Sequence, residues 1–442
     1  MRQRLDLDQG AGLERKPIIP RSARQYLPQP EPKGAAQKIM STLYTTIDDA
    51  PPARRFALFD YGFRPFFLLA GVYAMAIVPI WLYFYAHSPT TFGALPPMYW
   101  HAHEMLYGFV TAAIAGFLLT AVPSWTGARG FAGTPLRMLV AAWLVGRIAM
   151  ATIGTVPFWV TALAELSMLA LLAALLLPPL VRSQNRNMPM LAVLAVLWLV
   201  DAAFLVALKK GDVLLASRTM TLAIDFVLIL VTIIGGRIVP AFTANALRRR
   251  GEMPDIVSRR WVETAVIGSM ILIALVDVFA PNGLTSATLA AIAAAMHVVR
   301  LSGWRSFKTR GESILWVLHV GYAWLPIGLA LKACYLFGAF DWASKWQHAL
   351  TAGVFGTMIL AVMTRASLGH TGRPLVVSRA ITAAYVLLTL GVALRVSSSF
   401  VSPHSYVTVV CIAGAAWTLA FALFLVVYAP ILIKPRIDGK PG

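Results

Sequence analysis

Residues 189–208 read PMLAVLAVLWLVDAAFLVAL, a run in which Asp201 is the one charged side chain. About 20 apolar residues in a helix cross the hydrocarbon core of a bilayer, where a helix satisfies its own backbone hydrogen bonds. Comparable runs recur along nearly the whole chain. The sequence therefore predicts an all-α polytopic membrane protein, a bundle of about twelve transmembrane helices. The predicted spans are 64–86, 100–123, 136–154, 157–180, 189–208, 216–236, 261–280, 284–300, 312–338, 346–366, 379–399 and 406–430.

Composition and charge agree with a membrane protein. Of the 442 residues, 58% are hydrophobic and 13% charged, whereas about a quarter of a soluble protein is charged. The net charge is +19, and the most basic loops all fall on one predicted side. This positive-inside pattern predicts that both termini are cytoplasmic. It also predicts contact with the lipid bilayer and its anionic headgroups, so no nucleic-acid partner is needed to explain the charge.

The chain divides into three predicted segments. Residues 1–55 lack an apolar run and are rich in Pro, Gln and Arg, which predicts a disordered, basic cytoplasmic tail without a signal peptide. Residues 56–432 form the transmembrane domain, and 433–442 form a short cytoplasmic tail. Cys334 and Cys411 have no CxxC or CxxCH partner, which argues against structural zinc and covalently attached c-type haem.

Three histidines share one predicted depth. His101 and His103, in WHAHEML, lie at the outer end of the second span, and His348 opens the tenth span on the same side. One interfacial histidine is usually hydrogen-bonded to backbone or headgroups. Three of them beside Glu104 favour a metal, because neutral imidazole is the commonest metal ligand and binds haem iron.

Helical geometry separates the two histidines of the second span. His101 shares a face with Glu104 and Met105, whereas His103 points nearly the opposite way. One of them would ligate a metal while the other serves a second site or a hydrogen bond, and the sequence does not choose. Small residues follow each candidate ligand, and they would permit either close helix packing or a flat macrocycle between helices. These rows are Gly108, Ala112 and Gly116, and Ala349, Gly353 and Gly356.

Other polar residues in or near the spans are also candidates, because their burial in lipid is costly. His319, with Tyr322 one turn later on the same face, could be a metal ligand, a proton relay or one member of a satisfied core pair with Tyr322. His370 is expected in the cytoplasmic loop after the tenth span. Asp225 is the most central acid, suited to a buried ion pair with an arginine or to proton delivery. The other acids in the spans are Glu165, Asp201, Glu263 and Asp277.

Three arginines lie in Gly-, Phe- and Pro-rich runs at the cytoplasmic ends of spans. They are Arg64 in GFRPFF, Arg237 in GGRIVPAFTAN and Arg365 in MTRASLGHTGRP. Positive-inside anchoring would explain them. The alternative is that they bind an anion or a cofactor carboxylate.

Several long motifs resemble the NnrS family. They are ALFDYGFRPFFLLAG, WHAHEMLYGFVTAAIAGFLLTAVPSWTG, GGRIVPAFTANAL, LHVGYAWLPIGLAL and HALTAGVFGTMILAVMTRASLGHTGRPL, within residues 55–430. The resemblance implies a twelve-span bacterial inner-membrane protein with haem and copper, linked to nitric oxide, nitrosative stress and denitrification. The family's His-rich motifs fall on His101, His103, Glu104, His319, His348 and His370.

A weaker likeness is to haem–copper oxidases and nitric oxide reductases, whose haem ligands lie near the outer ends of the second and tenth spans. Spans six and seven contain no histidine here, so the ligands of any copper must come from elsewhere.

The leading hypothesis is a haem and copper protein that binds or detoxifies nitric oxide. A haem of the b type would be held by His101 or His103 together with His348, and a second metal would lie near His319 or the remaining outer histidine. Binding ranks above reduction, which would need quinol electrons and protons relayed by Asp225, Glu104 and Tyr322. The alternative is a transporter of a metal, haem or an anion, although no internal repeat supports it.

Overall fold

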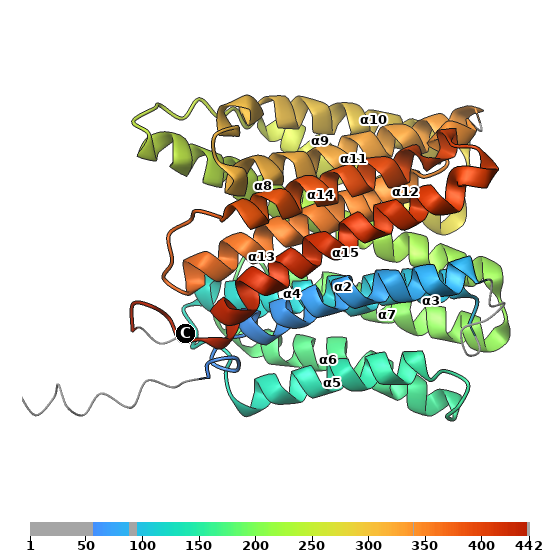
Figure 1. The fold of residues 1–442 in the computed structure, drawn as a ribbon, viewed down its shortest axis with the longest axis horizontal. Coiled ribbons are helices and arrows are strands. Elements are labelled where there is room, and N and C mark those ends of the chain that lie inside the picture. Colours follow the sequence, from blue (N-terminus) through green and yellow to red (C-terminus); the bar gives the residue numbers. More distant parts are fainter. Residues whose placement is uncertain (1–55, 88–94, 339, 440–442) are drawn as a thin grey trace, which may run out of the picture. The chain divides into compact units, whose positions relative to one another are not determined.

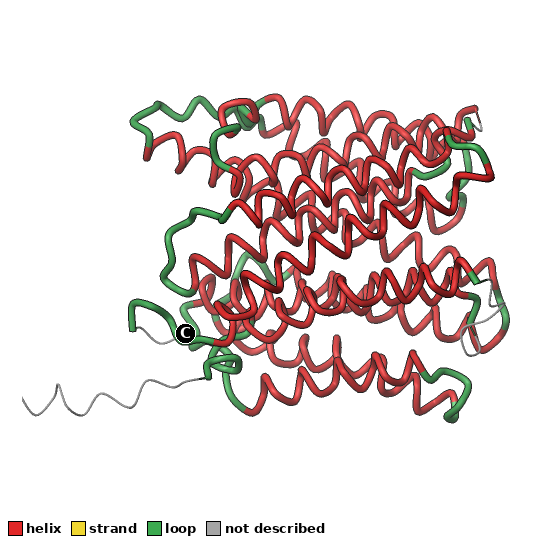
Figure 2. Tube along the Cα trace, viewed as in Figure 1, coloured by secondary structure: helices red, strands yellow, loops and turns green. Residues whose placement is uncertain are grey.

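The computed structural model describes residues 56–87, 95–338 and 340–439, so the predicted tail 1–55 lies outside the described residues. The described part consists of helices and connecting loops without a β-strand (Figures 1 and 2). Twelve of its helices are long and apolar enough to cross a membrane, which confirms the predicted fold class. These spans are α2 (Phe63–Ala86), α3–η2–α4 (Pro97–Thr126), α5 (Thr134–Ala151), α6 (Phe158–Arg182), α7 (Pro189–Lys210), α8 (Val213–Arg249), α9 (Arg260–Phe279), α10 (Leu284–Ser302), α11 (Ser313–Gly338), η4–α12–η5–α13 (Asp341–His370), α14–η6 (Arg379–Phe400) and α15 (Pro403–Ile433).

Helix α8 differs most from its predicted span of 216–236. It has 37 residues and runs from Val213 to Arg249. Asp212 is its N-cap, and the Asp212 side chain accepts a hydrogen bond from the Leu215 backbone nitrogen. A helix need not end where the apolar sequence ends, because a polar turn can continue into water. Arg249 there pairs with Glu312 at 3.3 Å. His370 likewise belongs to the last turn of α13 (Thr357–His370) rather than to the loop after it.

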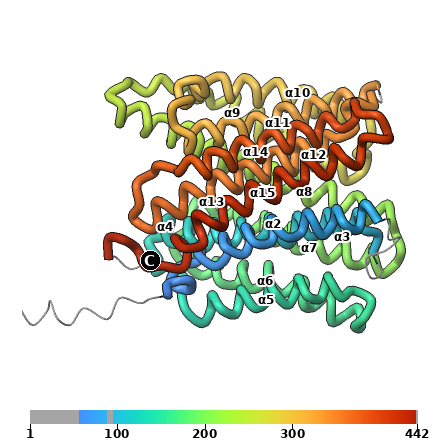
Figure 3. The backbone as a smooth tube through the Cα atoms, in the orientation of Figure 1, coloured from blue at the N-terminus to red at the C-terminus, as the bar shows by residue number. Residues whose placement is uncertain are grey.

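The spans that carry the candidate histidines lie inside the bundle. In their most apolar 18-residue windows, 83% of span two and 72% of span ten are buried, against 33–39% for seven of the other spans. Helix α15 packs along α2 and α14, and α10 packs along α9 and α11 (Figures 1 and 3). All of these helices except α11 belong to the less buried spans. Most residues of spans two and ten therefore face protein rather than lipid.

The small residues of these two spans receive aromatic rings. A Cβ on Gly116 would lie 2.6 Å from Phe67, and a Cβ on Gly353 would lie 2.7 Å from Trp324. Gly108 meets the Tyr73 ring in the same way. Such distances are shorter than any normal carbon contact, so these glycines serve close packing between helices.

Candidate functional site: an outer cavity and a buried polar cluster

A cavity of about 270 Å³ lies where spans two and ten begin, at the end of the bundle opposite the basic α8–α9 loop. We name it the outer cavity after the side on which the charge pattern predicts this end. His101 from α3 (Pro97–His103) and His348 from α12 (Trp346–His348) both line it. Apolar and methionine side chains make up most of the wall, and Arg395 of α14 contributes its one arginine. The volume is close to the lower end of the range for small-molecule sites, about 300 Å³.

The imidazole of His101 is fixed by stacking, but one of its ring nitrogens makes no hydrogen bond with the described residues. Its ring stacks on Trp81 with centroids 4.4 Å apart, and its Nδ1 is buried without a hydrogen-bond partner among the described residues. A buried ring nitrogen without a partner is uncommon, because the lost hydrogen bond costs about 1–3 kcal/mol. Two imidazoles from two helices on one apolar cavity are donors that suit haem iron. The two imidazoles therefore fit the ligand set of a haem iron.

A change of helix type follows each histidine segment. The π-helix η2 (Glu104–Val110) starts directly after His103, and the π-helix η5 (Ala349–Gly356) starts directly after His348. π turns are rare and frequently mark functional sites. Their wider turn also shifts which residues share a face.

This shift corrects the prediction that Glu104 shares a face with His101. Glu104 instead lies 2.9 Å from the Nδ1 of His103, measured from its Oε1, whereas Met105 lines the cavity with His101. The two histidines do face different surroundings, as helical phase predicts: His101 the cavity and His103 a polar cluster.

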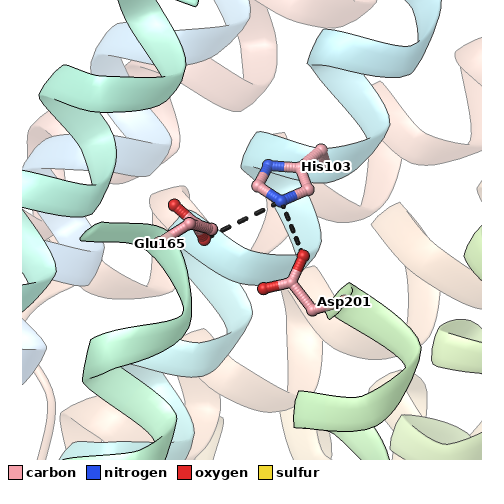
Figure 4. Close-up of side chains that lie close together, drawn as sticks. All are labelled: His103, Glu165 and Asp201. Carbon is pink, nitrogen blue, oxygen red and sulfur yellow. Dashed lines mark hydrogen bonds and ion pairs between the residues drawn. The ribbon is translucent and has the colours of Figure 1, made fainter. Parts of the chain in front are cut away.

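The cluster around His103 is almost fully buried. Its Nε2 lies 3.1 Å from Asp201 Oδ1 of α7 and 3.7 Å from Glu165 Oε1 of α6, so the ring stands between carboxyls of two helices (Figure 4). Arg147 of α5 donates to Glu104 Oε1 at 2.7 Å and also pairs with Glu165. Tyr73 donates to Glu104 as well.

This cluster could hold a metal ion, because one ligand atom each from His103, Glu165 and Asp201 lies within 4.8 Å of the others. One imidazole with two carboxylates suits a carboxylate-preferring divalent cation better than copper(I), which selects soft sulfur ligands. Arg147 already supplies a positive charge to two of the acids. The donor set therefore does not fit copper(I).

Tyr322 and His319, expected to work together, have separate partners. The ring nitrogens of His319 lie 2.9 Å from Ser306 Oγ and 2.9 Å from Thr243 Oγ1. Tyr322 instead pairs with His297, whose Nδ1 is 2.7 Å from its hydroxyl. His319 thus has the hydrogen bonds of a satisfied core residue.

Among the described residues, His370 belongs to no group of histidines, cysteines and acids that could hold a metal. Its ring stacks on Tyr61 at 6.1 Å and packs against Phe63, and its backbone oxygen accepts a hydrogen bond from Arg436.

The three candidate arginines lie outside the wall of the outer cavity. Arg64 donates to the backbone oxygens of Leu432 (2.9 Å) and Lys434 (2.7 Å), so it caps the end of α15. Arg237 donates to Asn187 Oδ1 at 2.8 Å. The guanidinium of Arg365 lies 3.8 Å from the centroid of the Phe242 ring.

Sequence reasoning missed Arg395, the arginine that does line the cavity. A signal was present, because an arginine at the outer end of a span runs against the positive-inside pattern. It also missed the basic partners of three acids in the spans. These ion pairs are Arg147–Glu165, Arg300–Glu263 and Lys332–Asp277.

The fold and the site define a polytopic helical membrane protein with one histidine from each of two buried spans on a common cavity. The chain belongs to the NnrS protein family, whose family model matches residues 57–436. A search of curated proteins finds no match.

Proposed function

We propose that this protein binds nitric oxide at a b-type haem in the outer cavity, in the cytoplasmic membrane of a bacterium. The observation that carries the proposal is that His101 and His348, from two different spans, line one cavity. Membership of the NnrS family supports it. Bound haem would supply an iron that takes up nitric oxide.

The chain's own residues would position and shield such a group. His101 and His348 would hold the iron, and one of the two would have to leave it for nitric oxide to bind. The Trp81 ring fixes the plane of the His101 imidazole by stacking. Arg395 would pair with a carboxylate of the haem, and Ser398 orients its guanidinium through a hydrogen bond of 3.0 Å. The mostly apolar wall would disfavour water, whereas a small apolar gas dissolved in the lipid could enter.

Reduction of nitric oxide is a further step of this proposal and would need electrons, for which a quinol in the bilayer is the candidate donor. Protons would have to pass through groups such as Asp225, Glu104 and Tyr322. Copper is expected from the family resemblance. We assign it no ligands, because the His103 cluster does not suit copper(I).

The test is the optical spectrum of the purified protein, oxidised, reduced and with nitric oxide added. We expect a Soret band that shifts with nitric oxide and that is lost or altered in His101→Ala and in His348→Ala. The matched control is His87→Ala, since His87 is exposed and lies outside the cavity wall. Unchanged spectra in both cavity variants would refute the ligand assignment.

Absence of a Soret band from protein expressed with ample haem would refute the haem site and favour a transporter. If haem is present, an electrode measurement of nitric oxide consumption with a quinol donor separates turnover from binding. Steady consumption would establish reduction, and a single stoichiometric uptake would establish binding alone.

A further inference from the structure

A second group of charged side chains is buried among α8, α9, α10 and α11. Asp277 of α9 pairs with Lys332 of α11 and accepts a hydrogen bond of 2.6 Å from Ser286 of α10. The carboxyl of Asp225, on α8, lies in hydrogen-bond contact with that of Asp277. Asp225 is 3% exposed, and the other three residues are 0–1% exposed.

The charges of this group do not balance. Two carboxylates and one ammonium leave a net charge of −1, and a buried net charge costs several kcal/mol. Among the described residues, Asp277 and Lys332 act on Asp225 from the helices packed against α8. Ser286 can donate only one hydrogen bond, and Asp277 receives it.

The contact between the two carboxyls also calls for an added proton. Ionised carboxylates only accept hydrogen bonds, so two of them in contact repel each other unless a proton lies between them. Asp225 Oδ2 is buried without a partner among the described residues. One added proton would supply the missing donor and neutralise the group.

We propose that Asp225 and Asp277 share one proton and, with Lys332, form a proton-binding site within the membrane. Lys332 is the fixed counter-charge, held over the Trp346 ring at 5.2 Å. Binding adds one H⁺ to a carboxylate oxygen, and release returns it to water and leaves the net charge of −1.

The site lies beside the outer cavity. Ser217, Met220, Thr221 and Ile224 of α8 line that cavity at helical spacing, and Asp225 is the next residue. The proposal does not rest on haem, because it follows from the carboxyl pair and its charge balance alone.

The test is infrared spectroscopy of the full-length protein in lipid nanodiscs at neutral pH, with and without aspartate ¹³C-labelled at its carboxyl. A protonated carboxyl has a C=O stretch well separated from the carboxylate bands, and the label separates aspartate from buried glutamates such as Glu165. We expect one protonated aspartate band in the wild type. Its absence would overturn the proposal.

Variants assign the band. Asp225→Asn and Asp277→Asn should each remove it, because Lys332 then neutralises the one remaining carboxylate. Lys332→Met should instead intensify it, because both carboxyls become protonated. The control Asp212→Asn, at the start of the same helix, should leave it unchanged. The assignment would be overturned by a band that survives both aspartate changes, or by a band that Lys332→Met does not intensify. If an aspartate variant does not fold, the labelled wild type and Lys332→Met remain decisive.

Discussion

Gly236 gives the sharpest test of how the buried charges are held. A Cβ at this position would lie 1.8 Å from the Arg300 guanidinium, so Gly236→Ala must displace that group. Arg300 is 4% exposed and donates hydrogen bonds of 2.8 Å to Thr232 O and to the Tyr322 hydroxyl. It also pairs with Glu263, whose side chain is 28% exposed.

The loss of stability expected for Gly236→Ala follows from the hydrogen bonds that Arg300 would lose. Each hydrogen bond to a charged group contributes about 1.5–3 kcal/mol, and two of them are buried. The pair with Glu263 adds less, because water screens that carboxylate. Alanine recovers up to about 1 kcal/mol of helix propensity over glycine. We expect Gly236→Ala to lower the free energy of unfolding by about 3 kcal/mol.

The assay is thermal unfolding in detergent, followed by tryptophan fluorescence. Gly235→Ala is the matched control, because its Cβ would meet the Tyr322 ring at an ordinary 3.4 Å and should be neutral or stabilising. In an Arg300→Met background, Gly236→Ala should cost nothing further, since the clash is gone. Equal melting temperatures for the two alanine variants, or a full cost of Gly236→Ala without Arg300, would refute this reasoning.

Three further outcomes are expected. Arg147→Met leaves Glu104 and Glu165 buried without their cation and should cost about 3–5 kcal/mol in the same unfolding assay, with partial recovery on adding Glu165→Gln; no recovery would contradict the charge argument. Arg64→Gln uncaps the end of α15 and should speed hydrogen exchange in its last turn by mass spectrometry, while the middle of the helix stays protected. His319→Asn should lower the melting temperature without changing the metal content measured by elemental analysis, and loss of a metal would show that its ring nitrogens are ligands.

Much of the fold was predictable from the sequence, because membrane crossing depends on local hydrophobicity. Twelve apolar runs predict twelve spans, and all twelve are found. The ends were less predictable, as α8 shows, because a helix continues into water wherever its polar turns find partners. The separation of His101 from His103 was also predictable, because residues two apart on a helix face different ways.

The sequence by itself determined the class of the protein and its number of spans. It also showed which polar side chains lie within the spans, where their burial is energetically unfavourable. The tertiary structure alone decided their partners: Glu104 turned to His103 where the helix becomes a π-helix, and Tyr322 paired with His297 rather than His319. Asp277 met Lys332, 55 residues away. An apolar span is specified by its own composition, but a buried charge is stabilised by whichever opposite charge the packing of other helices brings to it.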